Sequence, residues 1–178
     1  TRVVREGMDV TQGKLGMGFS CTSDDESALL LGNLLFGGSS NSKLFLNVRE
    51  KLSLCYYASS LYHRQKGLIT VSSGVEFADF QPAYEEILSQ LQALRQGQLE
   101  PWELAAAKGV LRSAYAAMED SQGRLENFWL GQAIEGRSDS PEDLSREMEE
   151  TSAERIFRAM ETVKLDTVYY LERKEAKA

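Results

Sequence analysis

The sequence predicts an α+β fold in which helices cover one face of a mainly antiparallel sheet. Residues 14–21 alternate between large apolar and small or polar side chains, as in a strand with one buried face. Two further apolar runs, at about 54–62 and 67–76, surround the turn "HRQKG", which is typical of a β-hairpin. The second half of the chain has mainly helical periodicity. Strands joined by a hairpin, with helices gathered in the second half, favour an α+β two-layer sandwich with a mainly antiparallel sheet.

The first strand has one apolar face and one nearly bare face. The apolar face carries Leu15, Met17, Phe19 and Cys21, and the other carries Lys14, Gly16, Gly18 and Ser20. We expect helices on the apolar face and open space over the other face.

Two helices are expected between this strand and the hairpin. Ser23 and Glu26 form a capping-box pattern before a leucine-rich helix that the glycine pair 37–38 terminates. A second, short helix is expected at about 42–51, where three apolar residues share one side: Leu44, Phe45 and Val48.

The second half predicts five helices and a closing strand. An amphipathic helix is expected at 80–96, and Pro101 suits the first turn of another that runs to about Met118. After the break "DSQG", a third helix is lined by Leu125, Phe128, Trp129 and Ile134. Two short helices begin at Ser140-Pro141 and at Thr151 with Glu154, and "VKLDTVYYL" closes the fold as a strand.

The chain is expected to form a single domain over residues 1–171, followed by a frayed polar tail at 172–178. It begins with Thr1 and already reads "TRVVREGMDV", as if entering a strand. We therefore expect a fragment of a longer protein.

Composition excludes several classes of function. A net charge of −7 without any block of Lys and Arg argues against a nucleic-acid surface, and no apolar run is long enough to span a membrane. Cys21 and Cys55 lie in apolar runs, which favours buried free thiols and a reducing cytoplasm.

Few residues suit catalysis. His63 is the one histidine in the chain, whereas the common catalytic zinc sites require two or three, so a solvated turn residue is the simpler interpretation. Cys55 with His63 as nucleophile and base would define a small-molecule enzyme, although their spacing places them far apart along one strand. The stretch "FGGSSNSK" lacks the Gly-Lys-Ser/Thr ending of a phosphate loop and follows a helix rather than a strand.

Arg49 and Tyr56 remain as candidates. On their own they are most simply a cation near a helix C-terminus and a half-buried strand aromatic.

The stretch "FGGSSNSKLFLNVREKLSLCYYASS" resembles the insulinase/pitrilysin/mitochondrial processing peptidase family of zinc metallopeptidases, in its second, non-catalytic domain. The family pattern is a glycine-rich helix end, Ser-x-Leu-Phe, Arg-Glu and Leu-x-Tyr. It is matched here by Gly37, Gly38, Ser42, Leu44, Phe45, Arg49, Glu50, Leu54 and Tyr56. The segments "LEPWELAAAKGVLRSAYAAMEDS" and "TSAERIFRAMETVKLDTVYYLE" extend the resemblance over nearly the whole chain. Within the family, the chain is most similar to the bacterial YmfF-type branch, which lacks the metal motif.

The resemblance implies a sheet of about six strands whose uncovered face lines a closed chamber. It also implies that Arg49 and Tyr56 are substrate-binding: the arginine would hold peptide backbone or a carboxylate, and the tyrosine hydroxyl would support the scissile carbonyl. Ser53 stands where the family usually has glycine, and Cys55 where a small residue is usual.

The family's catalytic motif, His-x-x-Glu-His, is absent from this chain, so no catalytic residue and no zinc are assigned to it. Zinc is expected in the homologous catalytic domain or partner. The chain alone is expected to have no activity, and a zinc metalloendopeptidase would require a His-x-x-Glu-His domain or subunit as partner. The alternative is a scaffold or assembly module of the same fold that does not bind peptide.

Overall fold

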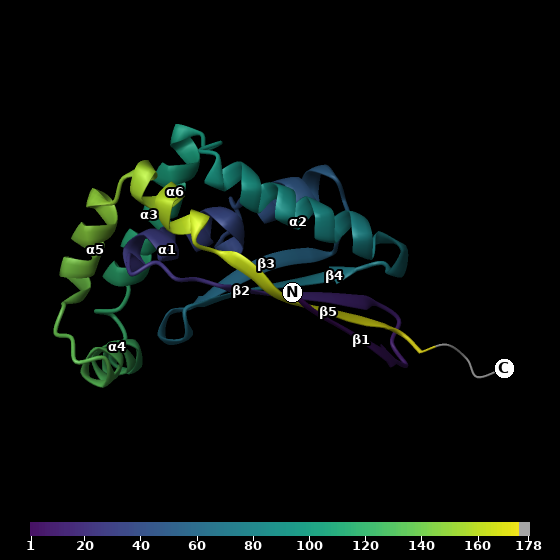
Figure 1. The fold of residues 1–178 in the computed structure, drawn as a ribbon. Helices are drawn as coiled ribbons and strands as arrows, with labels where there is room; N and C mark the ends of the chain where they lie inside the picture. The colour runs from purple at the N-terminus through teal and green to yellow at the C-terminus, as the bar shows by residue number, and fades with distance from the viewer. Residues whose placement is uncertain (175–178) are drawn as a thin grey trace.

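A computed structural model describes residues 1–174, in which a five-stranded sheet carries the helical layer on one face (Figure 1). The strands are β1 (Arg2–Met8), β2 (Gly13–Ser20), β3 (Tyr57–His63), β4 (Leu68–Val75) and β5 (Lys164–Arg173). They are ordered β1-β5-β2-β4-β3 across the sheet. β1 pairs with β5 in parallel, and the other neighbouring pairs are antiparallel. The predicted α+β class and the mainly antiparallel sheet are confirmed.

The expectation of about six strands is wrong for the described part of the chain, which has five. The sequence itself contains five strand-like runs, and the sixth strand came only from the family resemblance. β1 completes the five, because the opening run "RVVREGM" pairs with β5 along its whole length.

The helical layer combines α-helices with shorter helical turns. The α-helices are α1 (Glu26–Asn33), α2 (Phe80–Arg95), α3 (Pro101–Ala116), α4 (Gln122–Ile134), α5 (Pro141–Glu150) and α6 (Ala153–Glu161). Two wider π-helical segments, η1 (Leu34–Gly38) and η2 (Leu44–Lys51), stand where the sequence predicted a helix end and a short helix. The turns η3 (Arg64–Lys66) and η4 (Phe77–Asp79) are 3₁₀ helices. In Figure 1, α1, α2 and α6 lie on one side of the sheet, while α4 lies apart, near the β3–β4 hairpin.

The central strand β2 has the two different faces that its sequence predicted. Leu15, Met17 and Phe19 are at most 2% exposed and belong to the core beneath the helices. Gly16 and Gly18 alternate with them and face the other side, beside Tyr169 and Thr167 of β5. Burial of the large side chains fixes the register, because a slip by one residue would turn them to the uncovered face.

Two helix starts differ from the predicted caps. α1 is capped by Asp25, whose carboxylate accepts a hydrogen bond from Ala28 N at 3.1 Å, and not by Ser23. Ser23 Oγ instead accepts from Asp25 N at 3.1 Å.

Likewise, α6 is capped by Ser152 rather than by Thr151. The Thr151 hydroxyl is buried and donates to Glu147 O at 2.8 Å, so it belongs to the end of α5. The predicted cap of α5, Ser140 ahead of Pro141, is confirmed.

The hairpin forms as predicted, but β3 begins later than the sequence suggested. Leu54 N still donates to Val48 O in η2 at 3.1 Å, which keeps this residue out of the sheet. Tyr56 therefore precedes β3 rather than lying within it.

At the other end, β5 runs to Arg173, so residues 172 and 173 belong to a strand and not to the predicted tail. The tail positions 175–178 lie outside the described residues. Among the helices of residues 1–174, none has the length and apolar character needed to cross a membrane.

Candidate functional site

The corner between η2 and β3 presents the two candidate residues. The last turn of η2 is wide, since Leu52 N donates to Asn47 O at 3.1 Å. Ser53 follows with a φ of 52°, the left-handed region, and among residues 1–174 no other non-glycine residue has a positive φ. This left-handed residue reverses the chain and directs it into the sheet within a few residues.

Tyr56 is anchored to the sheet by its backbone and remains open at its side chain. Its N–H donates to Gly74 O of β4 at 2.8 Å, and the residue is 56% exposed. The phenol hydroxyl donates a hydrogen bond to a carboxylate oxygen of Glu76. This bond to a carboxylate raises the pKa of Tyr56 above its ordinary value, because it favours the protonated phenol.

Arg49 lies near the end of η2 with 41% of its side chain exposed. Its guanidinium stacks over the Phe45 ring at 4.8 Å, and its Nε lies 3.6 Å from a carboxylate oxygen of Glu50. An exposed pair at that distance contributes little to stability. The aromatic ring therefore orients the guanidinium, which can still donate hydrogen bonds to a carboxylate or a carbonyl oxygen.

Both side chains line one surface depression of about 470 Å³. Its remaining lining is Glu50, Ser53, Leu54, Cys55, Glu76 and Asp79. Arg49 also borders a second depression of about 320 Å³, which the glycine pair 37–38 and residues 57–59 of β3 help to form. The structure thus brings Arg49 and Tyr56 to a common open space, with Arg49 between two hollows.

The site of Arg49 is held by a contact that the sequence did not reveal. At the start of η2, the ammonium of Lys43 lies 3.1 Å from a carboxylate oxygen of Glu103 in α3, and both residues are 7% exposed. Glu103 also accepts a hydrogen bond from Glu100 N at 2.8 Å, which completes the capping box of α3. Buried charges survive when they are paired in this way, so the pair fixes η2 to the helical layer. Pro101 predicted the start of α3, but neither the capping role of Glu103 nor its distant lysine was predicted.

The alternative pair of Cys55 and His63 is not brought together. Cys55 is buried beside the Arg49 depression, and burial raises the pKa of its thiol, which disfavours the nucleophilic thiolate. His63 ends β3, and its Nε2 lies 2.9 Å from Thr70 Oγ1. It lines a different depression, so the structure gives no base for Cys55 within this pair.

The described residues do not fit zinc. Among residues 1–174, no three His, Cys, Asp or Glu side chains converge in a way that could hold a metal ion. His63, the single histidine, is engaged with a threonine hydroxyl instead.

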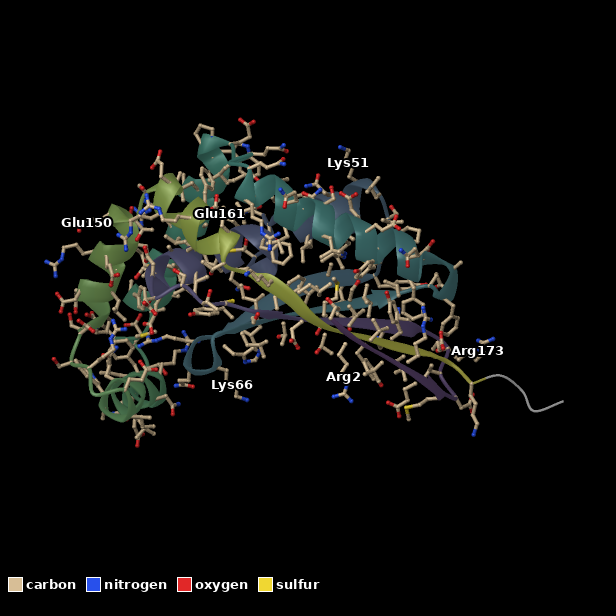
Figure 2. All side chains as sticks on the ribbon, viewed as in Figure 1. Arg2, Lys51, Lys66, Glu150, Glu161 and Arg173 are labelled. Carbon is tan, nitrogen blue, oxygen red and sulfur yellow. The ribbon has the colours of Figure 1, made fainter. Side chains whose placement is uncertain are left out.

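The uncovered sheet face carries small and aromatic side chains. Lys14 Nζ lies 5.2 Å from the centre of the Tyr57 ring, and the Tyr169 hydroxyl donates to Glu6 Oε2 at 2.6 Å. Figure 2 shows Arg2 and Lys66 projecting on this side, away from the helical layer.

Comparison with known proteins places these features in a family context. The sequence pattern of the "Peptidase M16 inactive domain" matches residues 1–111. A Bacillus subtilis (strain 168) protein named "Probable inactive metalloprotease YmfF" is 40% identical to this chain over 167 residues. The matched region covers 92% of this chain and 39% of that protein. It is 24% identical over 131 residues to "Uncharacterized zinc protease YmxG" of the same organism, covering 72% of this chain and 32% of that protein.

A solved structure of a conserved protein from Enterococcus faecalis V583 is also similar. It superposes with a TM-score of 0.88 at 27% identity, over 99% of this chain and 42% of that protein. The chain thus spans about two fifths or less of the length of these three proteins.

Proposed function

The chain belongs to the peptidase M16 family as one of its inactive domains, and from this premise we propose that it binds peptide and closes the chamber of a zinc-dependent endopeptidase. The observation that carries the proposal is the shared depression of Arg49 and Tyr56. The two residues stand at the matched positions of the family pattern, and both side chains are substantially exposed.

Arg49 would contact the peptide first. Its guanidinium is a planar fork that pairs with a carboxylate or with two carbonyl oxygens. The stack on Phe45 restricts its motion, so less conformational entropy is lost when substrate binds.

Tyr56 would act on the scissile carbonyl. Its hydroxyl has a single proton to donate, and in this structure Glu76 accepts it. Substrate must therefore displace Glu76 before the hydroxyl can stabilise charge that develops on the carbonyl oxygen.

The partner would be a homologous domain or subunit that carries His-x-x-Glu-His and holds the zinc. The uncovered sheet face, with Gly16 and Gly18 at its centre, would form one wall of the chamber between the two. When bound in the partner, zinc would activate water for attack on the peptide carbonyl. We place the assembly in the cytoplasm, because both cysteines are free thiols.

The test compares three variants in the complete full-length or two-subunit peptidase. Arg49→Ala should weaken peptide capture by roughly ten- to a hundred-fold, the loss expected for a charged, forked hydrogen-bonding partner. Tyr56→Phe should mainly lower kcat, because its contact strengthens in the transition state. Lys51→Ala is the matched control, since this cation ends the same helix and points away from the sheet (Figure 2).

Steady-state kinetics and peptide-binding titrations on folded protein give the readout. If Arg49→Ala and Tyr56→Phe both behave like Lys51→Ala, the pair does not bind substrate.

A scaffold role without peptide binding is the second candidate, and one observation favours it. The polar group of each candidate side chain already has a partner inside the chain: Glu76 contacts the Tyr56 hydroxyl, and Glu50 contacts the Arg49 guanidinium. The sequence of the partner decides between the two functions: a His-x-x-Glu-His segment there supports the peptidase, and its absence supports the scaffold.

A further inference from the structure

Helix α4 exposes apolar side chains that a surface helix ordinarily buries. Trp129, Leu130 and Ile134 are 42%, 57% and 71% exposed. Leu130 and Ile134 are four residues apart, so they lie on the same side of the helix. The one residue of α4 that is buried is the polar Gln132. Leu125 and Phe128 are half-buried, so α4 is only partly packed against the chain while three large apolar side chains remain exposed.

Polar contacts near its C-terminus attach α4 to the rest of the chain. The carboxylate of Glu135 pairs with the guanidinium of Arg64 in the hairpin turn and accepts from Gln65 Nε2 at 3.3 Å. Just beyond the helix, Arg137 donates to Glu26 Oε2 at 2.6 Å. These contacts position one end of the helix, but a helix of thirteen residues is only marginally stable in water without apolar packing.

The side of α4 that faces the hairpin is also incompletely filled. A depression of about 390 Å³ separates residues 62–66 from α4, and Gln132 lines it. Gln132 is 3% exposed, yet its Oε1 has no hydrogen-bond partner among the described residues. A buried amide oxygen without a donor is costly, so the packing between α4 and the hairpin is incomplete at this position.

We propose that α4 is a docking helix, and that its occupant is the second peptidase domain on the same polypeptide. The length of the relatives supports this occupant, because the chain spans 39% of YmfF and 42% of the Enterococcus faecalis protein. Each relative therefore has room for one more domain of this size. The inference rests on the proposed function and adds to it a contact outside the chamber wall.

The position of α4 suits this partner. It lies beside the tip of the β3–β4 hairpin and apart from α1, α2 and α6 (Figure 1). A domain that covered the open sheet face and reached past the hairpin would meet Leu130 and Ile134. Large apolar side chains in the centre of such a contact account for most of its affinity.

Cysteine accessibility in the complete polypeptide tests the proposal. Ile134→Cys is the reporter on α4, Glu85→Cys on the exposed side of α2 is the matched control, and Ser72→Cys reports on the open sheet face. Each variant is treated with a maleimide, and labelling at each position is read by peptide mapping. The labelling rate of each cysteine in the folded protein is divided by the labelling rate of the same cysteine in denaturant, which corrects for differences in intrinsic reactivity.

Ile134→Cys should label about ten-fold more slowly than Glu85→Cys, because a covered thiol reacts only when the contact opens. Equal rates at the two positions would overturn the proposal. If Ser72→Cys is protected while Ile134→Cys is not, the proposal that the open sheet face is a chamber wall is supported and the proposal that α4 is a docking helix is rejected. If Ile134→Cys is protected while Ser72→Cys is not, the docking helix is supported and the proposed chamber wall is rejected.

Dilution separates the second domain from a second copy of the chain. Protection by a domain of the same polypeptide does not depend on concentration, whereas protection by another copy falls on dilution. Protection of Ile134→Cys that disappears at low protein concentration would therefore contradict the proposed occupant.

Discussion

At the scale of single residues, Ser53 adopts the left-handed backbone conformation that turns the chain between Arg49 and Tyr56. A serine side chain disfavours this conformation. Its φ of 52° costs an ordinary residue about 1–2 kcal/mol, whereas glycine adopts it freely. Glycine also increases the entropy of the unfolded chain, by about 0.4–1 kcal/mol. We expect Ser53→Gly to raise the free energy of unfolding by a net of about 0.5 kcal/mol.

Urea denaturation measures this change, and Ser53→Ala is the control. Alanine keeps the side-chain restriction on φ, so its free energy of unfolding should not rise. If Ser53→Ala stabilises the protein as much as Ser53→Gly, the backbone angle is not the cause.

Sequence reasoning named the two candidate residues but not the side chains that contact them. Arg49 and Tyr56 were proposed from the resemblance of one short stretch to a peptidase family, because both match residues of the family pattern. Glu76 lies twenty positions after Tyr56 and meets it only because β4 returns beside the start of β3. Lys43 and Glu103 are sixty positions apart, and nothing in their local sequence indicates the pair.

At the scale of elements, Asp25 joins the start of α1 to α6. Its carboxylate caps α1 and accepts two hydrogen bonds from Arg155, Nε to Oδ2 and Nη2 to Oδ1, each at 2.9 Å. The Arg155 guanidinium holds the pKa of Asp25 below its ordinary value. The ionised form is therefore favoured in the folded protein. Its contribution is complete above the ordinary pKa of about 3.9 and is lost as the pH falls through the lower folded value.

We expect Asp25→Asn to lower the free energy of unfolding at pH 7 by about 1 kcal/mol, because the partly exposed pair loses its charge while the cap remains. The deficit should shrink when denaturation is repeated below pH 4, where wild type also loses the ionised carboxylate. The neighbouring exposed Asp24→Asn is the control and should change little. A deficit that is equal at both pH values would show that the charged pair is not its source.

The elements that the sequence predicted best are those with long, one-sided apolar patterns. β2, the hairpin and α2 appear close to their predicted positions, since one buried face determines each of them. The caps were less predictable, because "TSDDE" offers several capping side chains and contact with Arg155 on a distant helix selects Asp25. Thr151 fits a capping box equally well in sequence, but it is already engaged by the end of α5.

At the scale of the whole molecule, residues 1–174 cover the sheet on one side only, and the centre of the uncovered face carries Gly16 and Gly18. A side chain added at Gly16 would first meet Tyr169 at 3.7 Å, and one at Gly18 would meet nothing closer than 3.9 Å. These are ordinary contacts, so the described chain itself does not require glycine at either position. Small residues in a strand otherwise weaken it, so the two glycines fit the proposal that this face lines a chamber.

The isolated domain and the proposed assembly place different demands on Gly16. Gly16→Leu should leave the free energy of unfolding of this chain unchanged or slightly higher, because leucine suits a strand better and has room. In the complete peptidase the same leucine projects into the proposed chamber, so capture of peptide should fall by about ten-fold or more as volume is lost. Gly109→Leu is the matched control, since Gly109 on α3 has nothing within 4 Å of an added side chain and lies in the helical layer. Urea denaturation and peptide-binding titration together give the answer. A Gly16→Leu enzyme that is folded and binds peptide as tightly as Gly109→Leu would mean that the uncovered face is not the chamber wall.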